Sequence, residues 1–188
     1  IMGGDYAPEA PLKGIANLVD TLPEDTELVL IGEERTFDEY RSILDADQHQ
    51  QLSAVTTSQV IEMAESPTKA FSGKPDSSLA KGLEHLAGNE LDALISAGNT
   101  GAMMVGALYT VKAVSGVIRP PLTTLVPKPD GSYGIILDVG ANPDCKPEVL
   151  EQFGILGSMY LKSVYNFESP RVGLLNIGTE PEKGNVNA

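Results

Sequence analysis

The chain has 188 residues, of which 41% are hydrophobic and 21% charged, a composition typical of a globular protein with a sizeable core. Its formal net charge of −13 argues against non-specific nucleic-acid binding, because that binding needs Lys and Arg to neutralise phosphates. The single cysteine, Cys145, cannot form an intramolecular disulfide, and no apolar run approaches the roughly 20 residues of a membrane span. We therefore expect a protein of a reducing compartment with no nucleic-acid partner.

Short apolar runs alternate with helical patterns along the chain. In chain order, the pattern predicts a helix over 8–22, a strand over 27–32, a helix over 36–44, a strand over 53–57, a helix over 77–87, a strand over 92–97, a helix over 101–114, a strand over 134–139, a helix over 147–165 and a strand over 171–177. The strand runs are continuously apolar, which favours strands buried on both faces of a parallel sheet. The alternation predicts one α/β domain over 1–188 with right-handed crossovers.

One stretch departs from this alternation. Residues 122–126 and 133–139 are rich in residues that favour strands, and they flank Asp130-Gly131, a dipeptide typical of a hairpin turn. We therefore expect a hairpin excursion over 122–139 within a mixed, mostly parallel sheet.

Five polar loops with small residues lie at the predicted strand ends or helix starts. They span residues 2–5, 74–78, 96–101, 138–146 and 176–180. Open α/β sheets bind ligands beyond the carboxyl ends of their strands, and the free N–H groups at a helix start attract anions. Each loop alone is most simply a turn or a cap, with Ser77 or Ser78 and Asn99 or Thr100 as the capping residues. Together the loops favour a shared binding site.

Several familiar site signatures are absent from the sequence. There is no P-loop, no clean G-x-G-x-x-G after a strand, and no His/Cys spacing typical of zinc. Cys145 is more simply a structural thiol than a nucleophile, because neither His49 nor His85 stands in a context that marks a catalytic base. The loop carboxyls of Asp5, Asp76, Asp138 and Glu180 could hold a metal or anchor their loops. We assign no metal site and no cofactor.

Taken together, the loops resemble a known family. The motifs MGGD, DSSLAKGLEHL, DALISAGNTGAMM, RPPL, LDVGANPDCKPEVLEQFGILGSMY and RVGLLNIGTEPEKGN follow one another along the whole chain. They resemble those of the bacterial phosphate acyltransferase family PlsX, with Tyr6 at a position where the family often has Asn. Family members also carry a short strand before MGGD and a substantial portion after Gly184-Asn185. We therefore expect this chain to be a fragment that lacks both.

The resemblance implies a fold, an activity and partners. The fold is a three-layer α/β/α sandwich similar to isopropylmalate dehydrogenase, and the protein is a homodimer. The activity is transfer of a long-chain fatty acyl group from acyl carrier protein to inorganic phosphate. The acyl phosphate then passes to a membrane glycerol-3-phosphate acyltransferase for phospholipid synthesis. The protein is expected in the cytoplasm, with peripheral association at the inner face of the cell membrane.

This chemistry needs no protein nucleophile, because a phosphate oxygen can attack the thioester carbonyl directly. The protein must instead position phosphate and stabilise the oxyanion. The residues expected to bind phosphate are Ser96, Gly98, Asn99, Thr100 and Gly101. The catalytic candidates, as oxyanion donors, orienting carboxylate and countercharge, are Asn99, Asn142, Asp138 and Lys146. Further residues expected to line the site are Gly3, Gly4, Asp5, Asp76, Ser77, Asn176, Gly178, Thr179, Glu180 and Lys183.

Two other functions stay open at this point. A metal- and NAD-dependent decarboxylating dehydrogenase on the related fold would need clustered carboxylates and basic residues, and the sequence shows no dense Arg cluster. A non-catalytic module that binds a phosphate ligand is the other alternative. Docking of the acidic acyl carrier protein on this acidic chain would need a local basic patch, for example near Lys112 and Arg119.

Overall fold

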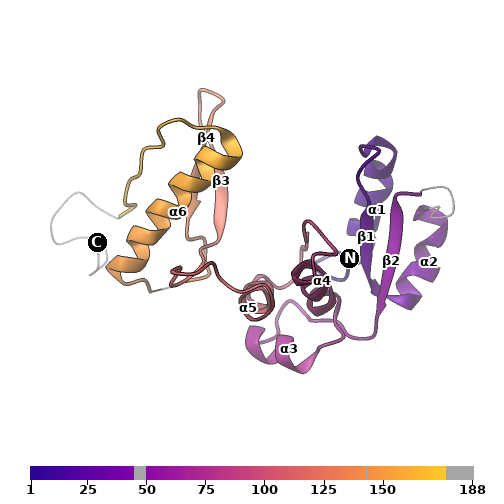
Figure 1. The fold of residues 1–188 in the computed structure, drawn as a ribbon. Coiled ribbons are helices and arrows are strands. Elements are labelled where there is room, and N and C mark those ends of the chain that lie inside the picture. Colours follow the sequence, from indigo (N-terminus) through magenta and orange to yellow (C-terminus); the bar gives the residue numbers. More distant parts are fainter. Residues whose placement is uncertain (45–49, 143, 177–188) are drawn as a thin grey trace. The chain divides into compact units, whose positions relative to one another are not determined.

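The structure is a computed structural model, and it describes residues 1–44, 50–142 and 144–176. The chain divides into two compact units, Ile1–Lys112 and Ala113–Ala188, whose elements are labelled in Figure 1. The described part of each unit has hydrophobic core residues of its own. The single domain expected over 1–188 stays a prediction.

The first unit is built around a parallel strand pair. Its elements are α1 (Glu9–Leu18), the 3-10 helix η1 (Val19–Thr21), β1 (Leu28–Glu33), α2 (Glu34–Leu44), β2 (Leu52–Thr57), α3 (Pro67–Gly73), α4 (Ser78–Ala87) and α5 (Thr100–Thr110). Strands β1 and β2 pair in parallel, from Leu28 beside Leu52 to Glu33 beside Thr57. This is the β–α–β arrangement that the apolar runs and the intervening helix predict.

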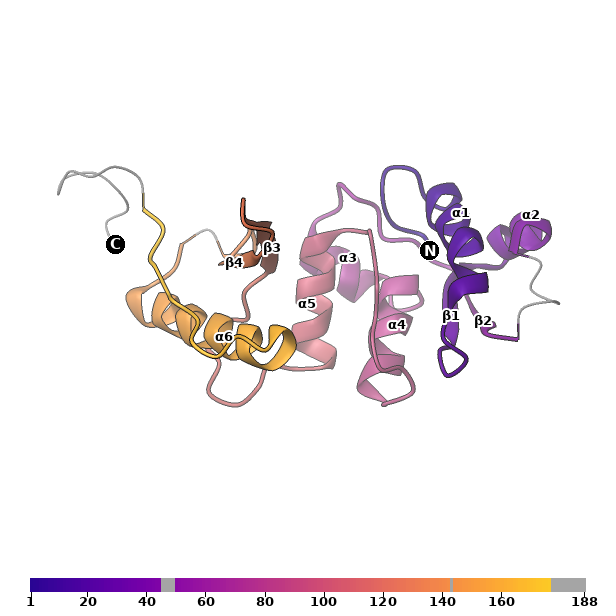
Figure 2. The ribbon, with the colours of Figure 1, turned by 90° about the horizontal axis from the view of Figure 1, so that it is seen from above.

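Helices pack on both faces of this pair. Leu30 faces the α1 and α2 side, where it joins a core with Leu12. The next residue, Ile31, faces α4, because a Cβ at Gly82 would lie 3.4 Å from the Ile31 Cδ1 atom. Figure 2 shows α4 and α2 on opposite sides of the two strands. The alternation of side chains along β1 therefore fixes which helices cover each face.

Glycine lets α5 pack closely within the same unit. A Cβ at Gly106 would lie 2.4 Å from Leu83 Cδ1 and 2.5 Å from Phe71 Cε2, so only glycine fits between α4 and α3. Leu83 and Ala102 form the centre of this core, with 2% and 0% of their surface exposed. The core fixes α5 and therefore fixes where its amino-terminal end lies.

The second unit consists of a hairpin and a long helix. Strands β3 (Thr123–Pro127) and β4 (Tyr133–Leu137) pair antiparallel, with Thr123 beside Leu137. This is the hairpin that Asp130-Gly131 predicts, and Gly131 has the positive φ of 79° that the turn requires. Helix α6 (Pro147–Tyr165) covers β4, and it has the bounds that the sequence predicts.

Two of the predicted strands are wrong for this structure. Neither 92–97 nor the described part of 171–177, which is 171–176, forms a strand. Ile95 is 91% exposed and Leu175 is 82% exposed, so neither side chain is buried by the described part of the chain. An apolar run becomes a strand only where a neighbouring strand accepts its backbone hydrogen bonds. Helix α3 has no counterpart among the predicted elements, and the helix predicted over 8–22 is divided between α1 and the 3-10 helix η1.

The fold class is thus mixed α/β, with parallel and antiparallel pairs. The three-layer sandwich with an isopropylmalate dehydrogenase-like topology stays a prediction. None of the helices in the described ranges combines the length and the apolar character that a bilayer crossing requires.

Candidate functional site

Two of the predicted loops meet in the first unit through glycine. A Cβ on Gly3 would lie 2.4 Å from the Gly98 Cα atom and 2.5 Å from the Gly98 nitrogen. Side-chain carbon atoms do not approach backbone so closely, so only glycine permits this contact. The 2–5 loop and the 96–101 loop, separated by more than ninety positions in the sequence, therefore lie against one another.

The first of these loops is held at the carboxyl end of β1. The Ile1 nitrogen donates a hydrogen bond to the Ile31 carbonyl at 3.0 Å, and the Thr36 hydroxyl donates to the Met2 sulfur at 3.7 Å. Gly32 leaves room for Ile1 and Met2, because a Cβ there would lie 2.7 Å from Ile1 Cγ1. The 2–5 loop thus begins where open α/β sheets place their ligand-binding loops.

The second loop leads directly into α5. Asn99 caps this helix, and its Oδ1 atom accepts a hydrogen bond from Ala102 N at 3.0 Å. The Ser96 hydroxyl oxygen accepts one from Gly98 N at 3.1 Å, which braces the approach to the helix. The N–H groups of Thr100 and Gly101 lack intrahelical acceptors, as at every helix start, and the helix dipole favours an anion beside them. The first turn of α5 carries no acidic side chain to oppose this.

The Asn99 amide group is fully engaged within the protein. Its Nδ2 atom donates to three carbonyl oxygens, those of Glu62 at 3.2 Å, Met63 at 3.1 Å and Glu65 at 3.0 Å. Only 7% of the residue is exposed. Asn99 therefore offers no free donor to a ligand in this conformation. No sequence signal connects this residue to acceptors 34 to 37 positions earlier.

The loop before α4 is also tied down by its own polar groups. Asp76 accepts hydrogen bonds from Ser58 N at 2.9 Å and from the Ser58 hydroxyl at 2.5 Å, and these bonds lower the pKa of its carboxyl. Ser77 caps α4 by accepting from Ala80 N at 3.3 Å. Asp76 thus anchors the loop to the residue that follows β2, and Ser77 fixes the start of α4, which are the simpler roles that their residue types indicate.

In the second unit, Asp138 organises the predicted catalytic loop. Its carboxylate accepts from Leu122 N at 2.6 Å, from Ala141 N at 2.8 Å and from Asn142 N at 2.7 Å. Burial alone would raise the pKa of Asp138, but the three backbone donors outweigh it and hold the pKa below its ordinary value. The Asn142 side chain donates to Pro120 O at 3.2 Å. Asp138 is therefore an ionised anchor that closes the loop onto 120–122.

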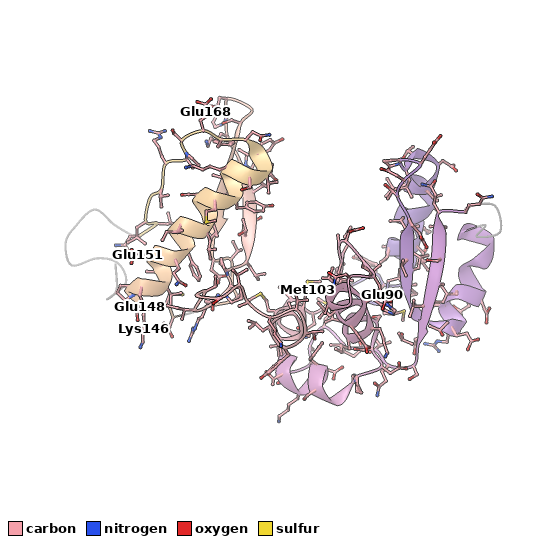
Figure 3. All side chains as sticks on the ribbon, viewed as in Figure 1. Glu90, Met103, Lys146, Glu148, Glu151 and Glu168 are labelled. Atoms are coloured by element: carbon pink, nitrogen blue, oxygen red, sulfur yellow. The ribbon has the colours of Figure 1, made fainter. Side chains whose placement is uncertain are left out.

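The remaining residues of this loop divide into a buried and an exposed group. Cys145 is buried against Val149 and Phe153, and its thiol points to Asn142 O at 3.6 Å, as a structural thiol would. Lys146 is exposed at the amino-terminal end of α6, near Glu148 (Figure 3). Lys146 is thus the residue of the loop that can offer a positive charge to a ligand.

Not every predicted site residue is placed by the structure. Asp5 and Asn176 are exposed. The residues that lie outside the described ranges are Gly178, Thr179, Glu180 and Lys183. Within the described ranges, His, Cys, Asp and Glu side chains form no group of three that could hold a metal. A single site formed from all five loops stays a prediction.

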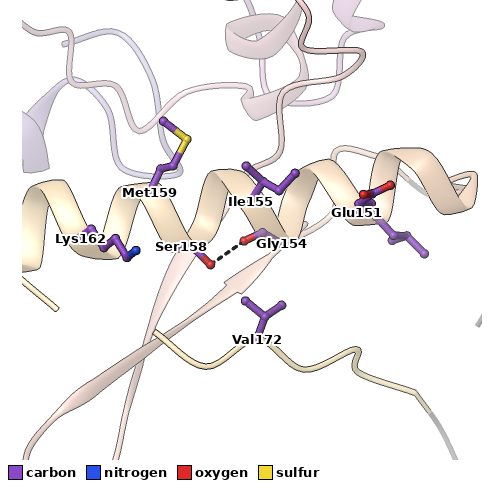
Figure 4. A pocket seen from close by; sticks show the side chains of 8 residues that line it. Glu151, Gly154, Ile155, Ser158, Met159, Lys162 and Val172 are labelled. Atoms are coloured by element: carbon purple, nitrogen blue, oxygen red, sulfur yellow. Dashed lines mark hydrogen bonds between the residues drawn. The ribbon is translucent and has the colours of Figure 1, made fainter. Parts of the chain in front are cut away.

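A shallow groove runs along α6, and none of the predicted site residues lines it. Figure 4 shows Val172 lying over Gly154 and Ser158, whose hydroxyl donates to Gly154 O at 2.9 Å. The lining residues are Leu150, Glu151, Gly154, Ile155, Ser158, Met159, Lys162 and Val172. The groove is mostly apolar and contributes no polar cluster to the candidate site.

Comparison with known proteins identifies the family. A family model described as "Fatty acid synthesis protein" matches residues 1–188, and the chain belongs to this family. Relatives from Bacillus pumilus and Thermoanaerobacterium thermosaccharolyticum, each 41% identical, and from Staphylococcus aureus, 40% identical, all bear the name "Phosphate acyltransferase". The alignments cover 98% of this chain and 53% or 54% of the relatives. The resemblance read from the motifs is thus confirmed, and the chain spans about half the length of the curated relatives it matches.

The contact between the two glycine loops generates a prediction about stability. Gly3→Ala places a methyl group into the Gly98 backbone, which cannot move without displacing the loop. We expect the free energy of unfolding to fall by about 1–3 kcal/mol, the usual cost of overpacking. Gly14→Ala is the control, because a Cβ at Gly14 would meet no atom within 4 Å. Urea unfolding of the intact protein measures both, and equal losses would contradict the contact.

A second prediction concerns Asp138 and pH. Its folded pKa lies below the unfolded value of about 4, so its stabilisation is present above that pH and is lost as the pH falls through the folded pKa. Asp138→Asn should lower the free energy of unfolding by about 1–3 kcal/mol at pH 7, because the amide keeps only one acceptor oxygen and turns an NH2 group toward backbone N–H donors. The difference from wild type should shrink below about pH 4. Asp144→Asn, at an exposed carboxyl, is the control, and a difference independent of pH would refute the anchor.

Proposed function

We propose that the protein transfers a long-chain fatty acyl group from a thioester of acyl carrier protein to inorganic phosphate. The acyl phosphate released is a precursor for phospholipid synthesis. The family and the shared name of the relatives support this proposal. The observation that carries it in this chain is the backbone contact of Gly3 with Gly98, beside the free N–H groups at the start of α5.

The α5 start suits phosphate in both charge and shape. Two glycine-bearing loops leave backbone, rather than side chains, against the ligand, and the N–H groups of Thr100 and Gly101 supply neutral donors. Neutral donors hold a phosphate dianion without pairing its charge with a cation, so its oxygen stays nucleophilic. The hydroxyl of the exposed Thr100 is a further donor within the same turn.

In the proposed reaction the protein positions phosphate and the thioester, and it supplies no nucleophile of its own. A phosphate oxygen attacks the thioester carbonyl carbon, a C–O bond forms, and the carbonyl oxygen becomes an oxyanion. Collapse of this intermediate breaks the C–S bond, and the proton carried by hydrogen phosphate ends on the departing thiol. Lys146, in the second unit, is the predicted source of positive charge in this reaction, and Asp138 holds the loop that carries it.

Partners and location form a further part of the proposal, supported by the resemblance to the family. Acyl carrier protein is the acyl donor, and exposed cations such as Lys112 and Arg119 are the candidates for contacting it. The active form is a homodimer in the cytoplasm that associates peripherally with the membrane and delivers acyl phosphate to the glycerol-3-phosphate acyltransferase there. The shared name of the relatives favours acyl transfer over the dehydrogenase alternative.

The direct test is product formation by the intact protein. Incubated with acyl-acyl carrier protein and inorganic phosphate, it should form acyl phosphate, which hydroxylamine traps as a hydroxamate. No hydroxamate above a reaction without phosphate would refute the proposal, and tight phosphate binding without product would favour the non-catalytic alternative.

Two substitutions at Thr100 test, in the same assay, whether its backbone N–H donates a hydrogen bond to phosphate. Thr100→Pro removes the backbone N–H and the hydroxyl at the first helical position, where proline is tolerated, and Thr100→Ala removes the hydroxyl and γ-methyl but keeps the N–H. Loss of a donor to a charged ligand costs about 1.5–3 kcal/mol, so the proline variant should raise the KM for phosphate at least about tenfold. The alanine variant should raise it less, and equal KM values for the two variants would contradict the backbone role.

A further inference from the structure

We propose that Asn99 is a positioning residue, whose amide group holds the turn of residues 60–66 so that its carbonyls leave the N–H donors of α5 free for phosphate. The inference rests on the proposed function and assigns Asn99 a role other than direct contact with substrate. "The 60–66 turn" denotes residues 60–66, which lie between β2 and α3 and lead directly into α3.

The geometry of Asn99 goes beyond that of a helix cap. A cap needs only the Oδ1 atom, which accepts from Ala102 N, and serine or aspartate supplies that oxygen equally well. Asn99 also directs Nδ2 to the carbonyls of Glu62, Met63 and Glu65, at 3.0 to 3.2 Å. Two amide hydrogens are thus shared among three acceptors. Only an amide side chain can both accept from Ala102 N and donate to these carbonyls.

A second brace holds the same turn from its other side. Lys74 Nζ donates to Val60 O at 2.6 Å and pairs with the Glu65 carboxylate. That carboxylate also accepts from Glu62 N at 2.8 Å. The turn is therefore fixed at its beginning by Lys74 and at its middle by Asn99, through contacts far apart in sequence.

The turn lies directly against the first turn of α5. A Cβ at Gly101 would lie 2.5 Å from Cγ of Pro67, the residue that follows the turn. The three carbonyls converge on the side chain of the capping residue, which directly precedes Thr100 and Gly101 in the chain. We therefore infer that they would compete for the N–H groups of these two residues if Asn99 did not hold them. Carbonyl oxygens carry partial negative charge, and freed from Asn99 they would take these donors or repel an anion.

The sharpest test replaces Asn99 by serine in the intact protein. Asn99→Ser keeps the capping oxygen and removes the amide donors. We expect amide hydrogen exchange within 60–66 to rise, while exchange within α5 stays slow because the cap is retained. The KM for phosphate should rise about tenfold, because fewer N–H donors are available to bind phosphate. The kcat should change less than about threefold, because the chemical step is not affected.

A second variant and a control separate positioning from general destabilisation. Lys74→Met releases the other brace of the turn and should reproduce the rise in KM, and the double variant should show less than the product of the two effects. Ser72→Ala, which removes an exposed hydroxyl on α3 that donates to the Thr68 and Lys69 carbonyls of the same helix, should change neither exchange nor KM.

Three outcomes would overturn the inference. The first is faster amide hydrogen exchange in the 60–66 turn of Asn99→Ser with an unchanged KM for phosphate. The second is a fall in kcat at constant KM, which would indicate that Asn99 contacts the reacting atoms. The third is unchanged exchange in Asn99→Ser. Phosphate affinity is also measured by titration of the amide signals. If the intact protein formed no acyl phosphate but Asn99→Ser weakened phosphate binding, the positioning role would stand and the proposed acyl transfer alone would fall.

Discussion

The candidate site depends on one backbone contact, that of Gly3 with Gly98. Because neither residue has a side chain, two loops from distant parts of the sequence approach as closely as backbone allows. The contact brings the loop at the end of β1 to the start of α5, where N–H groups lack acceptors. The core around Gly106 and Leu83 holds α5 in place, and the strand pair holds the 2–5 loop. The phosphate site that we propose there would need no charged side chain.

Several polar side chains in these loops form hydrogen bonds that hold the loops in their conformation. Asp138, Asp76 and Asn99 are the side chains that a search for catalytic groups would select first. Each is occupied by backbone donors or acceptors of its own unit. An ionised carboxylate that accepts several N–H groups stabilises a loop without extra countercharge, as the lowered pKa of Asp138 indicates. Within the described part of the first unit, the backbone N–H groups at the start of α5 and the exposed Thr100 hydroxyl are the candidates that remain for contacting a ligand.

The sequence predicts the local features well and the long-range ones poorly. Helix α6, the hairpin at Asp130-Gly131 and the caps Ser77 and Asn99 follow from residue types within a few positions of one another. The apolar run at 92–97 looked like a strand because periodicity cannot show whether a neighbouring strand is present. The bonds from Asn99 to 62–65 join segments with no shared pattern, so only the structure reveals them. The motifs identified the family because their order and residue types were both specific.

The most direct measurement is a titration of the isotopically labelled intact protein with inorganic phosphate, followed through backbone amide chemical shifts. Phosphate bound at the start of α5 should shift the amide signals of Thr100 and Gly101 saturably, together with those of Gly98 and Gly3 across the loop contact. Sulfate at equal ionic strength controls for non-specific anion effects. Saturable shifts confined to residues outside both loops, or no saturable shift of the Thr100 and Gly101 signals, would contradict the account.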